Sequence, residues 1–136
     1  MDQDLLRLDG KVVIVSGAAG GGLGTAITRF CAKAGATVLA VDCHEDRLAR
    51  DIAPLVAQDL KIETVVANVL AEDGIAAILD HARGIAGDLY GLVTVVGGGP
   101  PKTWGPTPQL SRADWRDQMA LNVDSMLFIS QAFAAE

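Results

Sequence analysis

Short apolar runs alternate along the chain with stretches in which apolar residues recur at helical spacing. The runs cover residues 11–15, 37–41, 61–67 and 91–96, and the first, KVVIV, has the β-branched character of a buried strand. Helical spacing follows in residues 23–34, 48–56, 71–82 and 111–133. Strands that alternate with helices predict right-handed crossovers and a parallel sheet. The pattern therefore predicts a single domain, residues 1–136, with an α/β fold and a doubly wound parallel sheet.

Three of the predicted helices carry further local signals. The first has an apolar stripe made of Leu23, Ala26, Ile27, Phe30, Cys31 and Ala34. The second contains Pro54, which should kink or shorten it. The last has Ser111 as a candidate N-cap with Asp114 in the capping-box place. Its stripe, made of Trp115, Met119, Asn122, Met126, Ile129 and Phe133, predicts that the one polar member is a buried amide that must find partners.

A glycine-rich turn, residues 16–24 with the sequence SGAAGGGLG, joins the first strand directly to the first helix. Glycine can adopt positive φ and has no Cβ to keep a ligand away from the backbone. The unpaired N–H groups of the helix's first turn, together with the helix dipole, attract an anion. The turn therefore predicts a site for the pyrophosphate of a nucleotide.

Three glycine patterns were compared with this turn. The P-loop pattern fails because Leu23 stands where its lysine is needed and Gly24 where its hydroxyl is needed. The pattern G-x-G-x-x-G has no full match. The pattern T-G-x-x-x-G-x-G fits when Ser16 replaces Thr and one extra glycine is allowed among residues 20–22, so that Gly17, Gly22 and Gly24 hold its fixed places.

The second predicted strand ends in Asp42. A carboxylate about 20 residues beyond such a turn can accept hydrogen bonds from the adenosine ribose, and it repels the 2′-phosphate of NADP. The predicted cofactor is therefore NAD. The alternative is that Asp42 only caps the helix that begins near Glu45.

Three motifs later in the chain support the same interpretation as the glycine turn and Asp42. The third apolar run closes with Asn68-Val69, the fourth ends at Gly97, and the last helix contains Leu121-Asn122-Val123. With these motifs the whole chain resembles the short-chain dehydrogenase/reductase family. Two positions depart from the family's pattern, because Asn68 replaces its usual Asp and residues 94–97, TVVG, keep only the glycine of Asn-Asn-Ala-Gly.

The resemblance implies a Rossmann-type sheet of strand order 3-2-1-4 and a set of site residues. It implies cofactor contacts from Ser16, Gly17, Gly22, Leu23, Gly24, Asp42, Asn68, Val69 and Gly97. It implies a catalytic role in a proton relay for Asn122, whose other interpretation is that it satisfies backbone groups at a helix irregularity. Residues 97–108 are expected to form a loop beside the cofactor or a plain surface connection, in which Trp104 is either a lid or a packing residue.

The family's Tyr-x-x-x-Lys motif has no counterpart in this chain. The single tyrosine, Tyr90, precedes the fourth predicted strand, and Thr94 occupies the place of the lysine. The resemblance therefore implies the incomplete, cofactor-binding half of an oxidoreductase that transfers a hydride between NAD and an alcohol or ketone and that assembles as a homo-oligomer. A non-catalytic dinucleotide-binding module or an inactive truncated product is the alternative.

Composition and charge exclude several classes of binding partner for this chain. The net charge of −6 argues against a nucleic-acid partner, which needs clustered Lys and Arg. Residues 1–10 are charged and no apolar run approaches a membrane span, so a cytoplasmic protein without a membrane partner is predicted. Cys31 and Cys43 are expected to be reduced. No metal is predicted, because consecutive residues such as 43–46 rarely converge on one ion.

Overall fold

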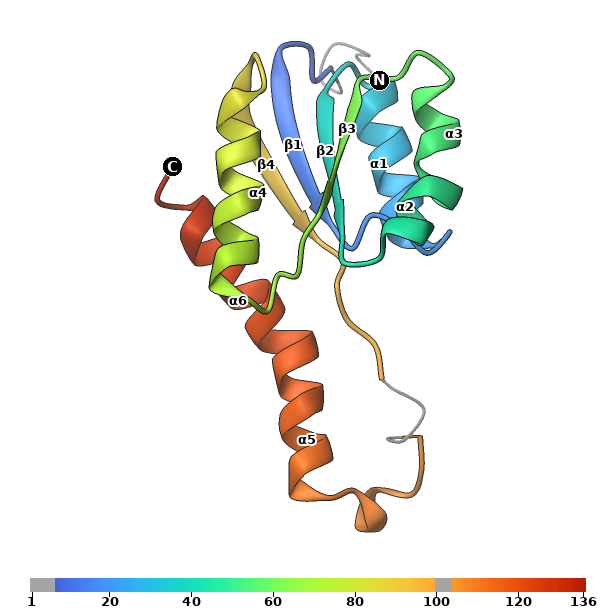
Figure 1. The fold of residues 1–136 in the computed structure, drawn as a ribbon, viewed down its shortest axis with the longest axis vertical. Coiled ribbons are helices and arrows are strands. Elements are labelled where there is room, and N and C mark those ends of the chain that lie inside the picture. Colours follow the sequence, from blue (N-terminus) through green and yellow to red (C-terminus); the bar gives the residue numbers. More distant parts are fainter. Residues whose placement is uncertain (1–6, 100–103) are drawn as a thin grey trace.

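The computed structural model describes residues 7–99 and 104–136. Residues 1–6, part of the charged N-terminal stretch, and residues 100–103, part of the predicted loop, lie outside the described residues. One parallel sheet has the strand order β3-β2-β1-β4 (Figure 1). Its strands are β1 (Lys11–Ser16), β2 (Thr37–Asp42), β3 (Ile62–Val66) and β4 (Asp88–Thr94). The predicted α/β fold and strand order are confirmed, although β4 begins three residues earlier than its apolar run.

The helices follow the strands in the predicted alternation. They are α1 (Leu23–Lys33), α2 (Glu45–Asp51), α3 (Ala53–Val56), α4 (Glu72–Gly84), α5 (Arg112–Met119) and α6 (Ser125–Phe133). The predicted second helix is split at Ile52, because Pro54 lacks the N–H needed to continue the ladder. A 3₁₀ turn, Thr107–Gln109, precedes α5, and a π-helical turn, Ala120–Asp124, joins α5 to α6.

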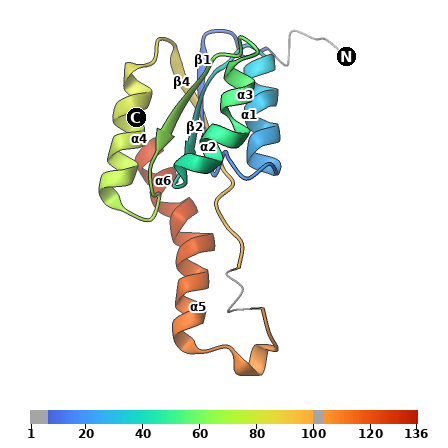
Figure 2. The ribbon, with the colours of Figure 1, turned by 45° about the vertical axis from the view of Figure 1, so that its right-hand side comes forward.

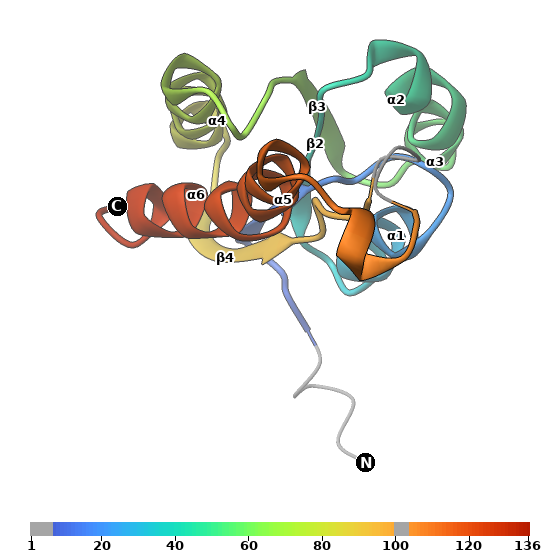
Figure 3. The ribbon, with the colours of Figure 1, turned by 90° about the horizontal axis from the view of Figure 1, so that it is seen from below.

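Two cores form because alternate residues of a strand point to opposite faces of the sheet. Val12 and Ile14 of β1 pack toward α4 and α6, whereas Val13 and Val15 pack toward α1, α2 and α3. Figure 3 shows α4 and α6 on one side of the sheet and α1, α2 and α3 on the other. The sheet is therefore doubly wound, as predicted.

The apolar stripe predicted for α1 is wrong at three positions, because Leu23, Ala26 and Phe30 are exposed. Ile27 and Cys31 of the stripe are partly buried and pack against the core, as predicted. The fully buried face of α1 consists of Gly24, Thr28 and Ala32, which the stripe did not include. The stripe therefore overlaps the packed side of α1 only in part.

Of the last two helices, α6 packs against the sheet and α5 projects from it (Figure 1). α5 extends beyond the strand ends together with the segment that leads into it (Figures 1 and 2), and Trp115 at 55% exposure is among its open side chains. Of the predicted stripe, only Ile129 is fully buried, so most of that prediction is wrong. Trp104 is 75% exposed and donates from Nε1 to the Gly99 carbonyl, which excludes packing into the core. Among the described residues no helix is long and apolar enough to cross a membrane.

Candidate functional site

A cavity of about 430 Å³ opens where the four strands end. It is lined by Gly17 and Ala19 after β1, by residues 41–44 and Arg47 around the end of β2, by residues 67–70 after β3, and by residues 95–97 after β4, with Leu121 completing the wall. In open α/β sheets ligands bind at the strand ends where the strand order reverses, here between β1 and β4. The volume lies within the range of small-molecule sites. A second cavity, of about 500 Å³ between α4 and α6, contains none of the predicted site residues.

The floor of the cavity is main chain held in place by Gly17. This residue has φ +75°, and its N–H and that of Ala18 both donate to the Val41 carbonyl at 2.8 and 2.9 Å. A Cβ added at Gly17 would lie 2.8 Å from the Val96 nitrogen, which is too close for any side chain. Glycine at position 17 therefore lets the turn rest against both β2 and the segment after β4.

The other two fixed glycines have different surroundings. Gly22 immediately precedes α1, and no atom of the described structure lies within 4 Å of a Cβ added there. A Cβ on the buried Gly24 would instead overlap the Gly17 carbonyl oxygen. Gly24 thus brings α1 close to the turn, while Gly22 leaves open space beside the first turn of the helix, as an anion site requires.

Four of the predicted cofactor contacts do not line the cavity: Ser16, Gly22, Leu23 and Gly24. Ser16 is fully buried, and its Oγ has no hydrogen-bond partner among the described residues. Leu23, the first residue of α1, is largely exposed. The structure therefore places Ser16 beneath the turn and Leu23 on its outer side.

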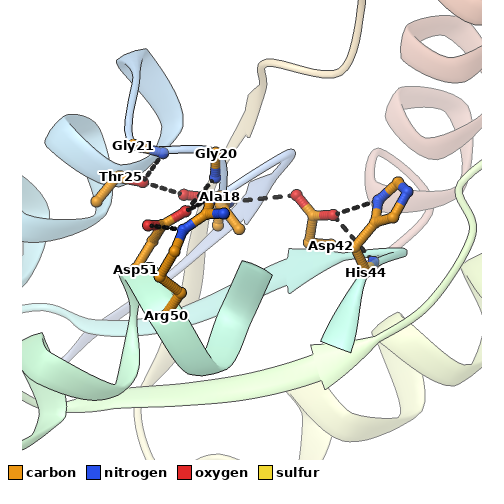
Figure 4. A network of polar contacts seen from close by, with 9 residues as sticks. Ala18, Gly20, Gly21, Thr25, Asp42, His44, Arg50 and Asp51 are labelled. Atoms are coloured by element: carbon orange, nitrogen blue, oxygen red, sulfur yellow. Dashed lines mark hydrogen bonds and ion pairs between the residues drawn. The ribbon is translucent and has the colours of Figure 1, made fainter. Parts of the chain in front are cut away.

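Asp42 lies at the cavity wall with only 8% of its surface exposed. Figure 4 shows its carboxylate bonded to His44. Oδ1 accepts the backbone N–H of His44 at 3.0 Å and lies 3.2 Å from His44 Nδ1, while Oδ2 accepts the Ala19 N–H at 3.3 Å. Its side chain makes no capping bond to α2, which begins at Glu45. The carboxylate thus stays at the end of β2, beside the glycine turn, where an acceptor for ribose hydroxyls is expected.

Asp42, Cys43 and His44 bring three metal-ligand atoms within 4.8 Å of one another. The hydrogen bonds from His44 to Asp42 account for this proximity as a property of the turn. Cys43 is exposed and Cys31 half-buried, where burial raises the pKa of the Cys31 thiol; both are free thiols. We assign no metal to the cluster.

The predicted residues after β3 and β4 also line the cavity. The Asn68 side chain is exposed, and its Oδ1 accepts the Leu70 N–H at 3.0 Å. Val69 is buried, and Gly97 forms part of the opposite wall. A Cβ at Gly97 would lie 2.9 Å from Asn122 Oδ1, so a side chain at position 97 would push against the last helix.

Asn122 is exposed rather than buried, but its amide is fully engaged. Oδ1 accepts the Gly98 N–H at 2.8 Å, and Nδ2 donates to the carbonyls of Gly98 and Gln118 at 2.8 and 2.9 Å. Asn122 lies within the π-helical turn, so the prediction that it satisfies backbone groups at a helix irregularity is confirmed. It ties the glycine segment after β4 to the last helix.

Several residues of the wall were not predicted from the sequence, among them His44, Arg47 and Leu121. Arg47 lies in the short helix that follows Asp42, and the first turns of such a helix border the strand ends. The sequence signal that could have identified Arg47 as a site residue is its position shortly after Asp42, the carboxylate at the end of β2. Leu121 precedes Asn122, but nothing in the sequence marks the π-helical turn that brings it to the cavity.

Comparisons with known proteins agree with this geometry. Residues 11–136 match the family model for short chain dehydrogenase. The 7alpha-hydroxysteroid dehydrogenase of Escherichia coli is 33% identical over 135 residues, which are 99% of this chain and 51% of that protein. Gluconate 5-dehydrogenase of Gluconobacter oxydans is 29% identical over 131 residues, covering 96% of this chain and 50% of that protein.

Solved structures give the same result. A 7 alpha-hydroxysteroid dehydrogenase complexed with NADH and 7-oxo glycochenodeoxycholic acid superposes with a TM-score of 0.86 at 32% identity, covering all of this chain and 51% of that one. An actinorhodin polyketide ketoreductase with NADPH, at 22% identity and a TM-score of 0.82, shares the fold. The chain thus spans about half the length of the relatives it matches. With the family model matching from β1 to the last residue, the chain belongs to the short-chain dehydrogenase/reductase family.

Proposed function

We propose that this chain is the cofactor-binding half of an NAD-dependent dehydrogenase that acts on a small alcohol or ketone. In the oxidative direction the substrate alcohol loses a hydride from its carbinol carbon to the nicotinamide and a proton from its hydroxyl, which leaves a ketone. The family supports a nicotinamide dinucleotide and a CH–OH substrate in its dehydrogenase members. The observation that carries the choice of NAD is Asp42 at the cavity wall.

The residues of the cavity fit the dinucleotide. Gly22 does not line the cavity itself, but the open space beside it at the α1 N-terminus would admit the pyrophosphate. Asp42 would accept the hydroxyls of the adenosine ribose, and Asn68 and Val69 would border the adenine. Gly97 would lie on the side opposite the glycine turn. When bound, the nicotinamide would supply the hydride acceptor, and the residues of the cavity would orient it.

Asn122 acts on the proton path by holding the glycine segment after β4. Its amide fixes both backbone groups of Gly98, so the loop beside the reacting groups keeps one shape. A Tyr-x-x-x-Lys pair, which the family carries beyond the region matched here, would exchange the substrate proton, with the lysine lowering the pKa of the tyrosine. We further propose that the whole protein is a cytoplasmic homo-oligomer.

Asp42 leads to a measurable preference between cofactors. A unit charge about 4 Å from the 2′-phosphate costs up to roughly 4 kcal/mol near a protein surface before screening by salt. We therefore expect NADH to bind about ten- to a hundredfold more tightly than NADPH. Titrations followed by nicotinamide fluorescence measure both affinities, and Asp42→Asn should narrow the ratio.

A matched control is Asp46→Asn, which removes the same charge from an exposed position of α2 outside the cavity. It should leave the ratio unchanged. Arg47 at the cavity wall makes this a demanding test, because its cation attracts any phosphate nearby. NADPH binding as tight as NADH binding by the unaltered chain would overturn the assignment of NAD.

A further inference from the structure

Because the turn has one glycine more than the pattern requires, part of it lies outside the cavity wall. We call this part, Gly20 and Gly21, the outward segment. None of Gly20, Gly21 and Gly22 lines the cavity, but only Gly20 and Gly21 have positive φ, at +106° and +70°. The Gly21 N–H donates to Thr25 Oγ1 at 3.2 Å, and that hydroxyl donates to the Ala18 carbonyl at 2.9 Å. The Gly20 N–H donates to Asp51 Oδ2 at 2.7 Å (Figure 4). The outward segment is therefore fixed from its own helix and from α2.

Asp51 is the last residue of α2, and its carboxylate is held on two sides. Arg50 donates from Nε to Oδ1 and from Nη2 to Oδ2, both at 2.8 Å. The side chain of Asp51 is 12% exposed, whereas that of Arg50 is 62% exposed. The hydrogen bond from Arg50, followed by the one from Gly20, lowers the pKa of Asp51 to about 2. The carboxylate is thus charged at neutral pH and is oriented toward the turn.

Packing does not hold this part of the turn. No atom of the described structure lies within 4 Å of a Cβ added at Gly20 or Gly21. Glycine also loses more backbone freedom on ordering than any other residue. A segment with several glycines and open space around it keeps one shape only if its polar groups are bonded, and charge-assisted hydrogen bonds are the strongest available.

We propose that Asp51 is a positioning residue for dinucleotide binding. Its carboxylate holds the Gly20 N–H on the side of the turn that faces α2. The extra glycine is thereby accommodated away from the ligand, and Gly22 and the first turn of α1 stay free to contact the pyrophosphate. Because the turn is shaped before the ligand arrives, binding does not have to order it. This inference rests on the proposed dinucleotide function, and Asp51 does not touch the ligand itself.

Binding of ADP-ribose and NADH to the 136-residue chain, measured by calorimetry, tests the proposal. Asp51→Ala should weaken both by about tenfold, in line with the loss of a charge-assisted hydrogen bond. Asp51→Asn keeps an acceptor but loses the charge, so its effect should be smaller. Asp59→Asn, an exposed acid in the turn after α3, is the matched control and should change affinity less than twofold. Circular dichroism melts check that each variant is folded.

Deleting Gly20 separates positioning from a general structural effect. The shortened turn fits the pattern T-G-x-x-x-G-x-G without an extra residue, so it has no outward segment for Asp51 to hold. Adding Asp51→Ala to this deletion should change the affinity less than twofold. An equal tenfold loss in both backgrounds would show that Asp51 acts through the stability of α2, and would overturn the proposal.

The Gly20 amide gives an independent readout in the protein without ligand. In ¹⁵N-labelled protein its proton resonance should move upfield in Asp51→Ala, as the bond to a carboxylate is lost. Unchanged ADP-ribose affinity in a folded Asp51→Ala protein refutes positioning, whatever the resonance does. If the unaltered chain binds neither NADH, NADPH nor ADP-ribose while the Gly20 resonance still responds to Asp51→Ala, the proposed function fails and the hydrogen bond stands.

Discussion

Gly17→Ala tests how the floor of the cavity is built. The new methyl group would lie 2.8 Å from the Val96 nitrogen and 3.0 Å from the Val95 carbonyl carbon, whereas ordinary contacts of this kind are about 3.5 Å. Overpacking of this degree costs about 1 to 3 kcal/mol. The φ of +75° adds about 1 to 2 kcal/mol for a residue with a side chain.

One effect acts in the opposite direction. Alanine has fewer conformations than glycine in the unfolded chain, which contributes about 0.4 to 1 kcal/mol of stability. The net destabilisation is therefore about 1 to 5 kcal/mol, with a central value of about 3 kcal/mol. For a domain of this size each kcal/mol shifts the melting temperature by about 4 °C, so Gly17→Ala should melt about 10 °C lower.

Thermal unfolding followed by circular dichroism at 222 nm measures this shift. Gly84→Ala is the matched control, because Gly84 lies in the helix α4 and a methyl group there would meet nothing within 4 Å. Its melting temperature should not fall below that of the unaltered protein. A Gly17→Ala protein that melts as high as this control would refute the account of the cavity floor.

Three further predictions concern binding, activity and association. Gly22→Val should leave the chain folded but abolish NADH binding, because the side chain would occupy the pyrophosphate position; calorimetry showing unchanged affinity would contradict the alignment of the turn. The purified 136-residue chain should show no NAD(H)-dependent turnover above buffer, because Tyr90 is followed by Thr94 rather than Lys, and any measurable rate free of host dehydrogenases would refute this. The chain should also self-associate, because β4 is an edge strand of the described sheet and α6 exposes Met126, Leu127 and Phe128. A concentration-independent monomer of 14.1 kDa in sedimentation velocity would be the contrary result.

The sheet could be predicted from the sequence because its signal is local. The two central strands, β1 and β2, are short apolar runs buried on both faces, and such strands need no alternation to be recognised. The position of Asp42 followed from the same run, since the residue that ends a parallel strand lies at the ligand edge. The break at Pro54 followed from its missing N–H.

The last helix could not be predicted in the same way. Its stripe assumed one constant period from Trp115 to Phe133, whereas the π-helical turn Ala120–Asp124 winds more slowly than an α-helix. The turn therefore shifts the phase of the stripe. In addition, α5 extends beyond the sheet (Figure 1) and none of its residues is buried, so Trp115 and Met119 have no core to pack against. Asn122 stabilises the turn through Gly98, 24 positions earlier in the chain, and no local pattern reports such a contact.

The hydrogen bond from Gly20 to Asp51 was also beyond the reach of the sequence. The sequence shows the extra glycine as an insertion, but the direction in which the Gly20 N–H points depends on which acceptor lies near it. That acceptor is 31 positions away, at the end of a helix that Pro54 cuts short. A longer α2 would have continued past Asp51 and placed other residues at its end.

The main-chain floor of the cavity has a consequence for how this protein can diverge. Gly17, Ala18 and Val41 are joined through backbone atoms, and no substitution removes a backbone carbonyl, while only proline removes an N–H. The walls are different, because Asn68, Arg47 and Leu121 present side chains that single substitutions replace. Descendants of this chain can therefore change what they accept, one wall residue at a time, while they inherit the same support beneath it.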